Sequence, residues 1–316
     1  MVAETILVAG GTGLIGEPVA RQLRSDGFQV RLLVRDLRRA RDRLGHDFAY
    51  VQGDVEDAAV VERAVAGCTG VHVSLGSAGT PQVIDRVEHG GTARLAAAAA
   101  RHGVARFSYL TGSLIHEAYG PKLPEHRAKL RAERAIQDSG VPYVFFRPTY
   151  FIDNLPRHVQ GKVAVVLGRR QPPLHMVAAG DFAGMVSRAF RIPEAANRDF
   201  FVHGPEAVTI PDALGLYGKL VKPGTRVVTV PLGSCRWPTG SSWVAASGPT
   251  SSSWGSSSAS ASGATRPGRP GRSARPPPPS ASGVSNAPTP PARGWPHGDE
   301  RGAGSLRRQT TKDPEG

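Results

Sequence analysis

Residues 5–16 read TILVAGGTGLIG, and this stretch decides the fold. Its first half, Thr5–Ala9, is a short continuous apolar run bounded by glycines, which is typical of a strand buried on both faces of a parallel sheet. A helix is predicted directly after the glycines, because Ile15, Val19 and Leu23 recur at four-residue spacing. The stretch therefore predicts a strand, a glycine-rich turn and a helix in immediate succession.

The alternation of strands and helices continues along the first half of the chain. Further strands are expected at 30–34, 49–52, 70–75, 106–112 and 143–148, and helices between them include an Arg-rich one after the second strand, 58–65, 83–102 and 124–139. Strands that alternate with helices at this spacing pair in parallel, with helices on both faces of the sheet. We therefore predict an α/β fold built on a doubly wound parallel sheet.

The glycines after the first strand follow the pattern G-x-x-G-x-x-G. Gly10 allows a tight turn, Gly13 lets the backbone approach a ligand without a Cβ, and Gly16 lets the helix pack closely on the strand. The start of the helix then offers free N–H groups and a positive dipole end, which favour a dinucleotide pyrophosphate over a glycine turn without a ligand. The predicted contacts are Gly10, Thr12, Gly13, Leu14, Ile15 and Gly16.

The end of the second strand predicts which dinucleotide binds. A carboxylate there binds the ribose 2′-OH of NAD, whereas an Arg nearby accommodates the 2′-phosphate of NADP. Arg35 stands at this point and Asp36 follows it directly. We predict NADP(H) with Arg35 as the phosphate contact, while Asp36 leaves NAD(H) open and an ordinary exposed Arg is the alternative for Arg35.

Asp54 lies in the turn QGDVED after the third expected strand. This turn follows the strand at the edge where the nucleotide is expected, so the Asp54 carboxylate is predicted to meet the adenine amino group. The alternative is that Asp54 caps the next helix, and both roles can hold together.

The charge of the chain does not indicate a nucleic-acid partner. Lys and Arg number 39 against 26 Asp and Glu, a net charge of +13. The surplus is shared between residues 1–232 and 233–316, and neither part contains a Lys/Arg run of the kind that binds nucleic acid. Nucleic acid is therefore not an expected partner.

The composition changes abruptly at Gly233. Residues 233–316 contain 17 Ser, 13 Gly and 13 Pro, and all four Trp of the chain. Such a segment cannot bury enough apolar surface to offset its conformational entropy. Two hypotheses for residues 233–316 stay open: a disordered tail, or an out-of-frame translation that replaced the true C-terminus. The second is favoured because the strand-like run TRVVTVPL, 225–232, should lead into further structure.

The cysteines and histidines indicate the cellular compartment of the protein and whether it binds a metal. Cys68 and Cys235 are the only cysteines, and the histidines show no metal-ligand spacing, so neither a disulfide framework nor a metal site is predicted. No signal peptide or membrane-length apolar stretch is apparent. A cytoplasmic protein that does not bind membranes is the expectation.

Several segments together carry a family resemblance. They are GGTGLIG, LLVRD, QGDVED, RFSYLTGS, HRAKLRAERAIQDSGVPYVFFRPTYFIDNL and GDFAGMVSRAF. Over residues 4–232 the chain resembles the NmrA-like branch of the atypical short-chain dehydrogenases. The resemblance implies an NAD(P)-binding Rossmann domain over 1–150 and a small substrate-binding lobe over 151–232, in which Asp181 is expected to cap a helix.

The usual proton donor of the short-chain dehydrogenases is missing. Those enzymes use Tyr-x-x-x-Lys, because four-residue spacing places both side chains on one helix face and the Lys cation favours the tyrosinate. Four residues before Lys129 stands Glu125. The nearest tyrosine upstream, Tyr119, is followed by Gly-Pro and cannot share a regular helix face with Lys129.

Other site residues come from the resemblance. It places the active-site hydroxyl at Thr111 and Ser113 and matches Lys129 to the lysine that contacts the nicotinamide ribose. The alternative for Lys129 is a surface pair with Glu125 or Glu133 at four-residue spacing.

Without the tyrosine, hydride transfer suits an acceptor such as a quinone or an enone, which could take its proton from water, His126 or Tyr150. Tyr150 follows the sixth strand, where ligands bind in open α/β sheets, and packing of the lobe is its alternative. The family includes both reductases and non-catalytic redox sensors. The sequence thus predicts an NADP(H)-dependent oxidoreductase acting on a small molecule, with an NADP(H)-sensing regulator that binds a protein partner as the rival.

Overall fold

The computed structural model describes residues 4–117, 123–168 and 172–231, which belong to one compact unit. Seven strands form the main sheet: β1 (Thr5–Ala9), β2 (Gln29–Val34), β3 (Ala49–Gln52), β4 (Gly70–Val73), β5 (Arg106–Leu110), β6 (Tyr143–Pro148) and β11 (Arg198–Val202). Every neighbouring pair is parallel, and the order is β11-β6-β5-β4-β1-β2-β3. The predicted parallel sheet is confirmed.

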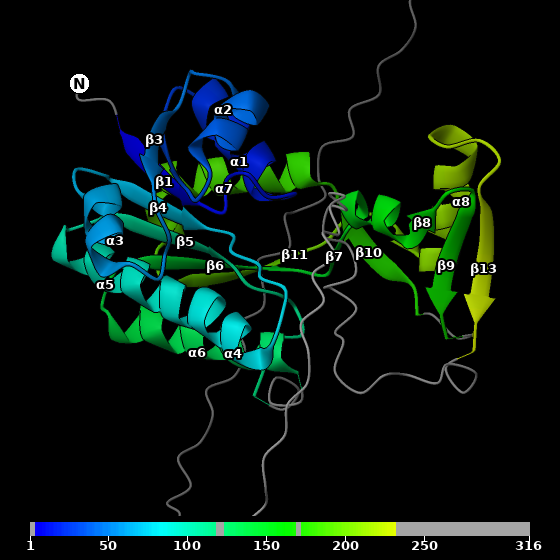
Figure 1. Cartoon of the computed structure of the whole chain (residues 1–316). Coiled ribbons are helices and arrows are strands. Elements are labelled where there is room, and N and C mark those ends of the chain that lie inside the picture. The colour runs from blue at the N-terminus through cyan, green and yellow to red at the C-terminus, as the bar shows by residue number, and fades with distance from the viewer. Residues whose placement is uncertain (1–3, 118–122, 169–171, 232–316) are drawn as a thin grey trace, which may run out of the picture. The chain divides into compact units, whose positions relative to one another are not determined.

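Helices cover both faces of this sheet (Figure 1). One face carries α1 (Gly16–Ser25), α2 (Leu37–Leu44) and α7 (Ala179–Arg191), and the other carries α3 (Ala58–Val65), α5 (Thr92–Arg101) and α6 (Pro124–Asp138). The fully buried neighbours Leu7 and Val8 of β1 enter different cores, Val8 with Leu23 and Phe182, and Leu7 with Leu95. A strand covered on both faces has no polar side, which explains the continuous apolar run in its sequence.

The strand order reverses direction at β1. From β1 the chain proceeds outward to β2 and β3, and then returns to β4 on the other side of β1. In open α/β sheets ligands bind outside the carboxyl ends of the strands at this switch point. The glycine stretch follows β1 and therefore lies where the topology predicts a ligand.

The helix predicted over 83–102 consists of three parts. It begins as α4 (Pro81–Ile84), widens into the π-helical segment η1 (Asp85–Gly91) and continues as α5. A π turn accommodates one extra residue, so it shifts the side chains on either side of it relative to a regular α-helix. Within η1 the side chain of Glu88 is buried.

Two elements after residue 150 return to the main sheet. β11 extends it beside β6, and α7 packs on α1 and on Phe28 after it, whose ring lies 6.2 Å from that of Phe190. Arg106 donates to the carbonyl oxygen of Ala189 at 2.9 Å near the end of α7. The division at residue 150 stays a prediction about domains, but the main sheet itself does not end there.

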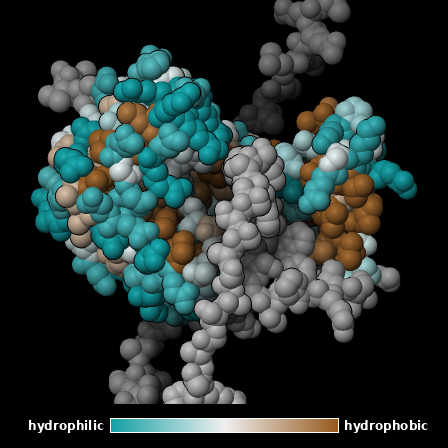
Figure 2. All heavy atoms as spheres, viewed as in Figure 1, coloured by the Kyte–Doolittle hydropathy of each residue, from teal (hydrophilic) through white to brown (hydrophobic). Residues whose placement is uncertain are grey.

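A smaller lobe contains the remaining elements. One exception is η4 (Pro193–Ala195), which follows α7 and contributes Ala195 to a core of the main sheet. The elements of the lobe are β7 (Tyr150–Phe151), η3 (Ile152–His158), β8 (Val159–Gln160), β9 (Val163–Leu167), β10 (Leu174–Val177), β12 (Ala207–Val208), α8 (Ile210–Leu220) and β13 (Arg226–Val230). Leu155, Ala164, Val166, Ala213 and Leu214 form the core of the lobe. Apolar side chains also gather on the surface of this lobe (Figure 2). Among the lobe's large apolar residues, Leu216, Leu220, Val221 and Val228 are exposed. The strand expected from TRVVTVPL is β13.

The predictions about residues 233–316, including the out-of-frame reading, and about Tyr119 fall outside the described residues. In the described ranges, no helix is both long and apolar enough to span a bilayer. The same ranges contain no group of three or more potential metal ligands. Cys68 is a buried thiol, and burial raises its pKa.

Candidate functional site

The three predicted glycines meet in a tight cradle at the end of β1. Gly10 has φ +88°, a backbone conformation that favours glycine, and a Cβ on it would lie 2.5 Å from the carbonyl oxygen of Ser74. A Cβ on Gly16 would lie 2.2 Å from the carbonyl oxygen of Gly10, whereas one on Gly13 would lie 3.1 Å from the same oxygen. Close contact of β1, α1 and the loop after β4 therefore requires glycine at positions 10 and 16.

Polar groups of this cradle lack partners within the protein. Across the described ranges, the N–H groups of Thr12, Leu14, Ile15 and Gly16 donate no hydrogen bond, and α1 has no side-chain cap. The Ser74 hydroxyl is buried beside Gly16 and also has no partner among those residues. Unpaired N–H groups at the start of a helix form a site for an anion. The residues present thus fit a pyrophosphate.

The two residues after β2 have different roles. Asp36 caps α2, with its Oδ1 accepting a hydrogen bond from the Arg39 N–H at 3.0 Å. Arg35 is exposed, and in the described part of the chain its guanidinium has neither an ion pair nor a hydrogen bond. One oxygen of the carboxylate that could bind a ribose 2′-OH therefore already caps α2, while the guanidinium beside it has no partner among the described residues.

Asp54 closes a short turn rather than a helix end. Its Oδ1 accepts a hydrogen bond from the Glu56 N–H at 3.0 Å. The cap of α3 is Asp57, which accepts hydrogen bonds from the N–H groups of Ala59 and Val60. The cap alternative for Asp54 is wrong, because the helix starts three residues later than that role requires. Its contact with adenine stays a prediction.

Lys129 of α6 lies beside the carboxyl end of β5. Its Nζ donates to the carbonyl oxygen of Leu110 at 3.2 Å and lies 3.9 Å from Glu88 Oε2. The ammonium also lies 5.4 Å from the ring centroid of Tyr109. The predicted alternative, a surface pair with Glu125 or Glu133, is wrong because the side chain turns toward β5. β5 is two strands from β1, so its carboxyl end lies roughly 10 Å across the sheet from that of β1, which the glycine cradle follows.

The two hydroxyl candidates after β5 differ in their partners. Thr111 is buried, and its hydroxyl donates to Glu133, which in turn binds Arg147 through two hydrogen bonds of 3.0 and 2.9 Å. Ser113 is half-buried, its N–H donates to the carbonyl oxygen of Pro148, and its hydroxyl has no partner among the described residues. Of these two hydroxyls, only that of Ser113 is free to meet a ligand.

Tyr150 belongs to the lobe. Its hydroxyl pairs with His158 Nε2 at 2.9 Å, its ring packs on the lobe core, and burial raises its pKa. The Tyr150 hydroxyl therefore already has a hydrogen-bond partner within the lobe, and its ring packs as the predicted alternative describes. His126 lies in the first turn of α6 and is half-buried.

The sequence reasoning missed several polar residues of this region. Glu88 and Ser74 carry no motif, and nothing in their sequence context distinguishes them from solvated residues. Asp181 does not cap α7, because the N–H of Ala179 at the helix start is bound by Asp153 Oδ2 at 2.8 Å. The buried His72 has its pKa lowered to about 3 by desolvation, so it is neutral and no proton donor.

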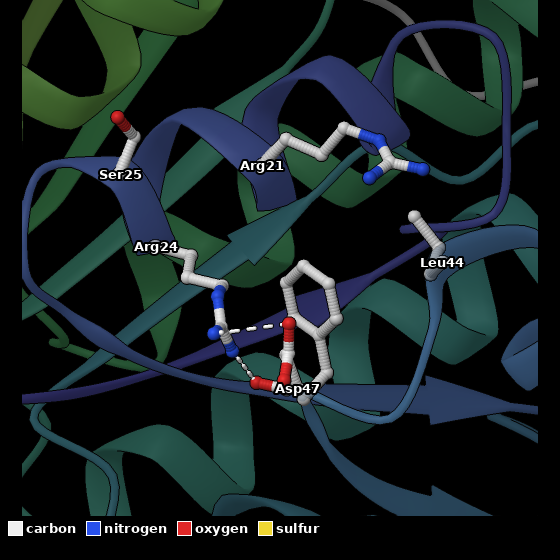
Figure 3. A pocket seen from close by; sticks show the side chains of 6 residues that line it. Arg21, Arg24, Ser25, Leu44 and Asp47 are labelled. Carbon is white, nitrogen blue, oxygen red and sulfur yellow. Dashed lines mark hydrogen bonds and ion pairs between the residues drawn. The ribbon is translucent and has the colours of Figure 1, made fainter.

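A shallow hollow at the C-terminal end of α1 is separate from the glycine cradle. Figure 3 shows Arg21, Arg24, Ser25, Leu44 and Asp47 around it, and its volume is about 260 Å³. Arg24 Nη2 lies 3.2 Å from Asp47 Oδ2, so the acid neutralises the cation nearest to it. The hollow lies at the last turns of α1, whereas the unpaired N–H groups lie at the first turn.

Comparisons with known proteins agree with this geometry. The family model described as NAD(P)H-binding matches residues 10–191. An NAD(P)H azoreductase from Xenophilus azovorans is 30% identical over 209 residues, 65% of this chain and 69% of that protein. A (4-alkanoyl-5-oxo-2,5-dihydrofuran-3-yl)methyl phosphate reductase from Streptomyces griseus is 31% identical over 207 residues, with the same coverage of 65% and 69%. A photosystem II assembly factor, Ycf39, from Trieres chinensis is 24% identical over 233 residues, 72% of each chain.

Solved structures share the fold. The triphenylmethane reductase of Citrobacter sp., complexed with NADP(H), superposes with a TM-score of 0.58 at 19% identity, covering 72% of this chain and 79% of that one. An NADPH-dependent quinone oxidoreductase from Escherichia coli, complexed with NADPH, gives a TM-score of 0.58 at 19% identity, covering 72% and 78%.

Proposed function

Because the chain belongs to the NAD(P)H-binding family, we propose that it is an NADPH-dependent reductase of small unsaturated acceptors such as quinones or enones. The resemblance to the atypical short-chain dehydrogenases is confirmed at the level of this family and of the Rossmann fold, and NAD(P)H is the cofactor. The preference for NADPH, the acceptor and the site residues are the proposed part.

The strongest support for NADPH is the arrangement after β2. Asp36 uses one carboxylate oxygen to cap α2, and Arg35 has no acidic partner among the described residues. A guanidinium binds phosphate through two parallel hydrogen bonds, which suits the 2′-phosphate that NADPH has and NADH lacks.

The other candidate residues would each bind a different part of the cofactor. The glycine cradle and the N–H groups of Thr12, Leu14, Ile15 and Gly16 would hold the pyrophosphate. Asp54 would bind the adenine amino group, and Lys129 would bind the nicotinamide ribose. When bound, the reduced nicotinamide supplies a hydride. The chain's own contribution is then to orient this cofactor at the carboxyl edge of β4 and β5.

The acceptor is inferred from the proton chemistry. No Tyr-x-x-x-Lys pair precedes Lys129, and the hydroxyls of Thr111 and Tyr150 already have partners. Hydride addition to a simple ketone gives an alkoxide, which needs a positioned acid, whereas addition to a quinone or an enone gives a delocalised anion that water can protonate. Ser113 could bind the carbonyl oxygen of such an acceptor. The names of the two reductase relatives, an azoreductase and an oxo-dihydrofuran reductase, point to unsaturated acceptors as well.

An acceptor panel tests this function. We expect the purified chain to oxidise NADPH with quinones and enones and to leave simple ketones unreduced, as followed by the loss of NADPH absorbance. A protein sample without NADPH-binding capacity, such as a Gly16→Ala variant, serves as the control for contaminating reductases. Turnover confined to simple ketones would contradict the proposal.

Arg35→Ala is expected to weaken NADPH binding by about 10- to 100-fold, because charge-assisted hydrogen bonds contribute about 1.5–3 kcal/mol. NADH binding should change little, since it lacks the 2′-phosphate. Isothermal titration with each nucleotide measures both constants, and Arg198→Ala, at an exposed Arg of β11, is the matched control. Equal loss of NADPH and NADH affinity in Arg35→Ala would exclude the phosphate contact.

The rival function is an NADPH-sensing regulator without turnover. The Trieres chinensis relative, which is named as an assembly factor, favours it. Both functions need the glycine cradle, so nucleotide binding alone does not separate them. Stoichiometric NADPH binding without turnover on the whole acceptor panel would favour the regulator.

A further inference from the structure

Glu88 is a buried carboxylate that contacts two parts of the candidate site. Its side chain is 4% exposed, and its Oε1 accepts hydrogen bonds from the Ser77 N–H at 2.8 Å and the Ser77 hydroxyl at 3.0 Å. Ser77 lies in the loop that follows β4, the neighbour of β1. The other oxygen, Oε2, lies 3.9 Å from Lys129 Nζ. Glu88 therefore connects the loop after β4 with α6.

Lys129 depends on this carboxylate for its counter-charge. The Lys129 side chain is 19% exposed, and its ammonium donates one hydrogen bond, to the carbonyl oxygen of Leu110. Glu133, on the same helix, is engaged by Arg147 and Thr111. Within the described ranges Glu88 is the one carboxylate that pairs with Lys129. At 3.9 Å the two groups are too far apart for a direct hydrogen bond, so the ammonium keeps donors for a ligand hydroxyl.

The backbone of η1 places Glu88 in this position. A π turn adds a residue to the helix, and each residue of an α-helix rotates the side chain by about 100°. The side chains before and after η1 therefore follow different faces, and Glu88 lies inside the turn with Ser77 on one side and Lys129 on the other. Isolated π turns are frequent at functional sites.

We propose that Glu88 is a positioning residue for the cofactor: its charge holds the Lys129 ammonium at the carboxyl edge of β5, and its hydrogen bonds order the loop after β4, so that both meet the nicotinamide ribose. This inference rests on the proposed function, because it requires NADPH to bind along that edge. Glu88 acts through Lys129 and Ser77 and does not itself touch the cofactor.

A double-mutant cycle on NADPH binding tests the proposal. Glu88→Gln keeps an oxygen that can accept from Ser77 but removes the charge, and Lys129→Met removes the ammonium. We expect each single variant to weaken NADPH binding about tenfold, and Glu88→Gln to add little when Lys129→Met is already present, since coupled residues are non-additive. Isothermal titration with NADPH gives the four constants, and thermal denaturation shows that each variant is folded.

Asp85→Asn is the matched control, because it tests whether losing any ion pair between η1 and α6 weakens NADPH binding. Asp85 Oδ1 pairs with Arg131 Nη1 at 2.7 Å, so this variant removes an ion pair between the same two elements without touching Lys129. NADPH affinity should be unchanged in it. If Glu88→Gln does not fold, Ser77→Ala removes one of the hydrogen bonds to Glu88, and it should weaken NADPH binding by a smaller factor only while Lys129 is present.

Different outcomes test the proposed function and the Glu88 assignment separately. Failure of the wild-type chain to bind NADPH would overturn the proposed function and this inference together. NADPH binding by the wild type with additive effects of Glu88→Gln and Lys129→Met, or with no effect of Glu88→Gln, would overturn the Glu88 assignment alone.

Discussion

Replacing Gly16 by alanine is expected to raise the Kd for NADPH at least about 100-fold. The new Cβ would lie 2.2 Å from the carbonyl oxygen of Gly10 and 2.7 Å from the Ser74 hydroxyl, so α1 must move away from β1. That shift takes the unpaired N–H groups of residues 14–16 out of line with the pyrophosphate, and each such charge-assisted bond contributes about 1.5–3 kcal/mol. Overpacking also costs stability, by about 1–3 kcal/mol. Isothermal titration and thermal denaturation measure the two effects.

Gly184→Ala is the control for this prediction. Gly184 lies within α7, and nothing lies within 4 Å of a Cβ built on it. Alanine there should leave NADPH binding unchanged and stabilise the protein by about 0.5–1 kcal/mol, because glycine inside a helix loses more conformational entropy. Similar NADPH affinity in Gly16→Ala and the wild type would mean that the cradle is not the pyrophosphate site.

Glu133→Ala is expected to reduce the free energy of unfolding by about 3–5 kcal/mol. Its carboxylate is buried and accepts two hydrogen bonds from Arg147 and one from the Thr111 hydroxyl. Without this carboxylate, the side of the Arg147 guanidinium that faces α6 loses its counter-charge. Removing one partner of a buried ion pair lowers the free energy of unfolding by about 3–5 kcal/mol. A typical domain is stable by only about 5–15 kcal/mol, so the variant should unfold far below the wild-type denaturant midpoint.

Urea unfolding followed by far-ultraviolet circular dichroism measures this loss. Tryptophan fluorescence is unsuitable, because residues 1–232 contain no Trp. Asp199→Asn is the control: Asp199 also binds Arg147, at 2.8 Å, but its side chain is 41% exposed, so its loss should cost about 0–1 kcal/mol. Equal destabilisation by both variants would show that burial does not govern this network.

This network changes the interpretation of Thr111. The resemblance assigned Thr111 and Ser113 together to the active-site hydroxyl, and nothing in the local sequence separates them. The structure engages the Thr111 hydroxyl with Glu133 and leaves that of Ser113 unpaired among the described residues. A Thr111→Val variant should therefore affect stability through Glu133, and Ser113 is the better candidate for contact with an acceptor.

The sequence by itself determined the features that depend on near neighbours in the chain. Apolar runs and periodic helices located six of the seven main strands, and the spacing of Gly10, Gly13 and Gly16 after β1 located the tight glycine cradle. Arg35 and Lys129 stay predictions as cofactor contacts, Arg35 from its place after the second strand and Lys129 from the family resemblance. Such patterns can be recognised in the sequence because strand and helix periodicity is set within a few residues.

Only the tertiary structure decided the pairings between distant residues. Arg147 meets Asp199 across 52 positions, Ser77 meets Glu88 through a π turn that no periodicity reveals, and β11 joins the sheet after a long excursion of the chain. The capping of α2 by Asp36 was likewise decided by the fold, since a cap and a ribose contact both suit an Asp at that point. A polar side chain can be satisfied by many partners, and the packing of the whole chain selects which one it reaches.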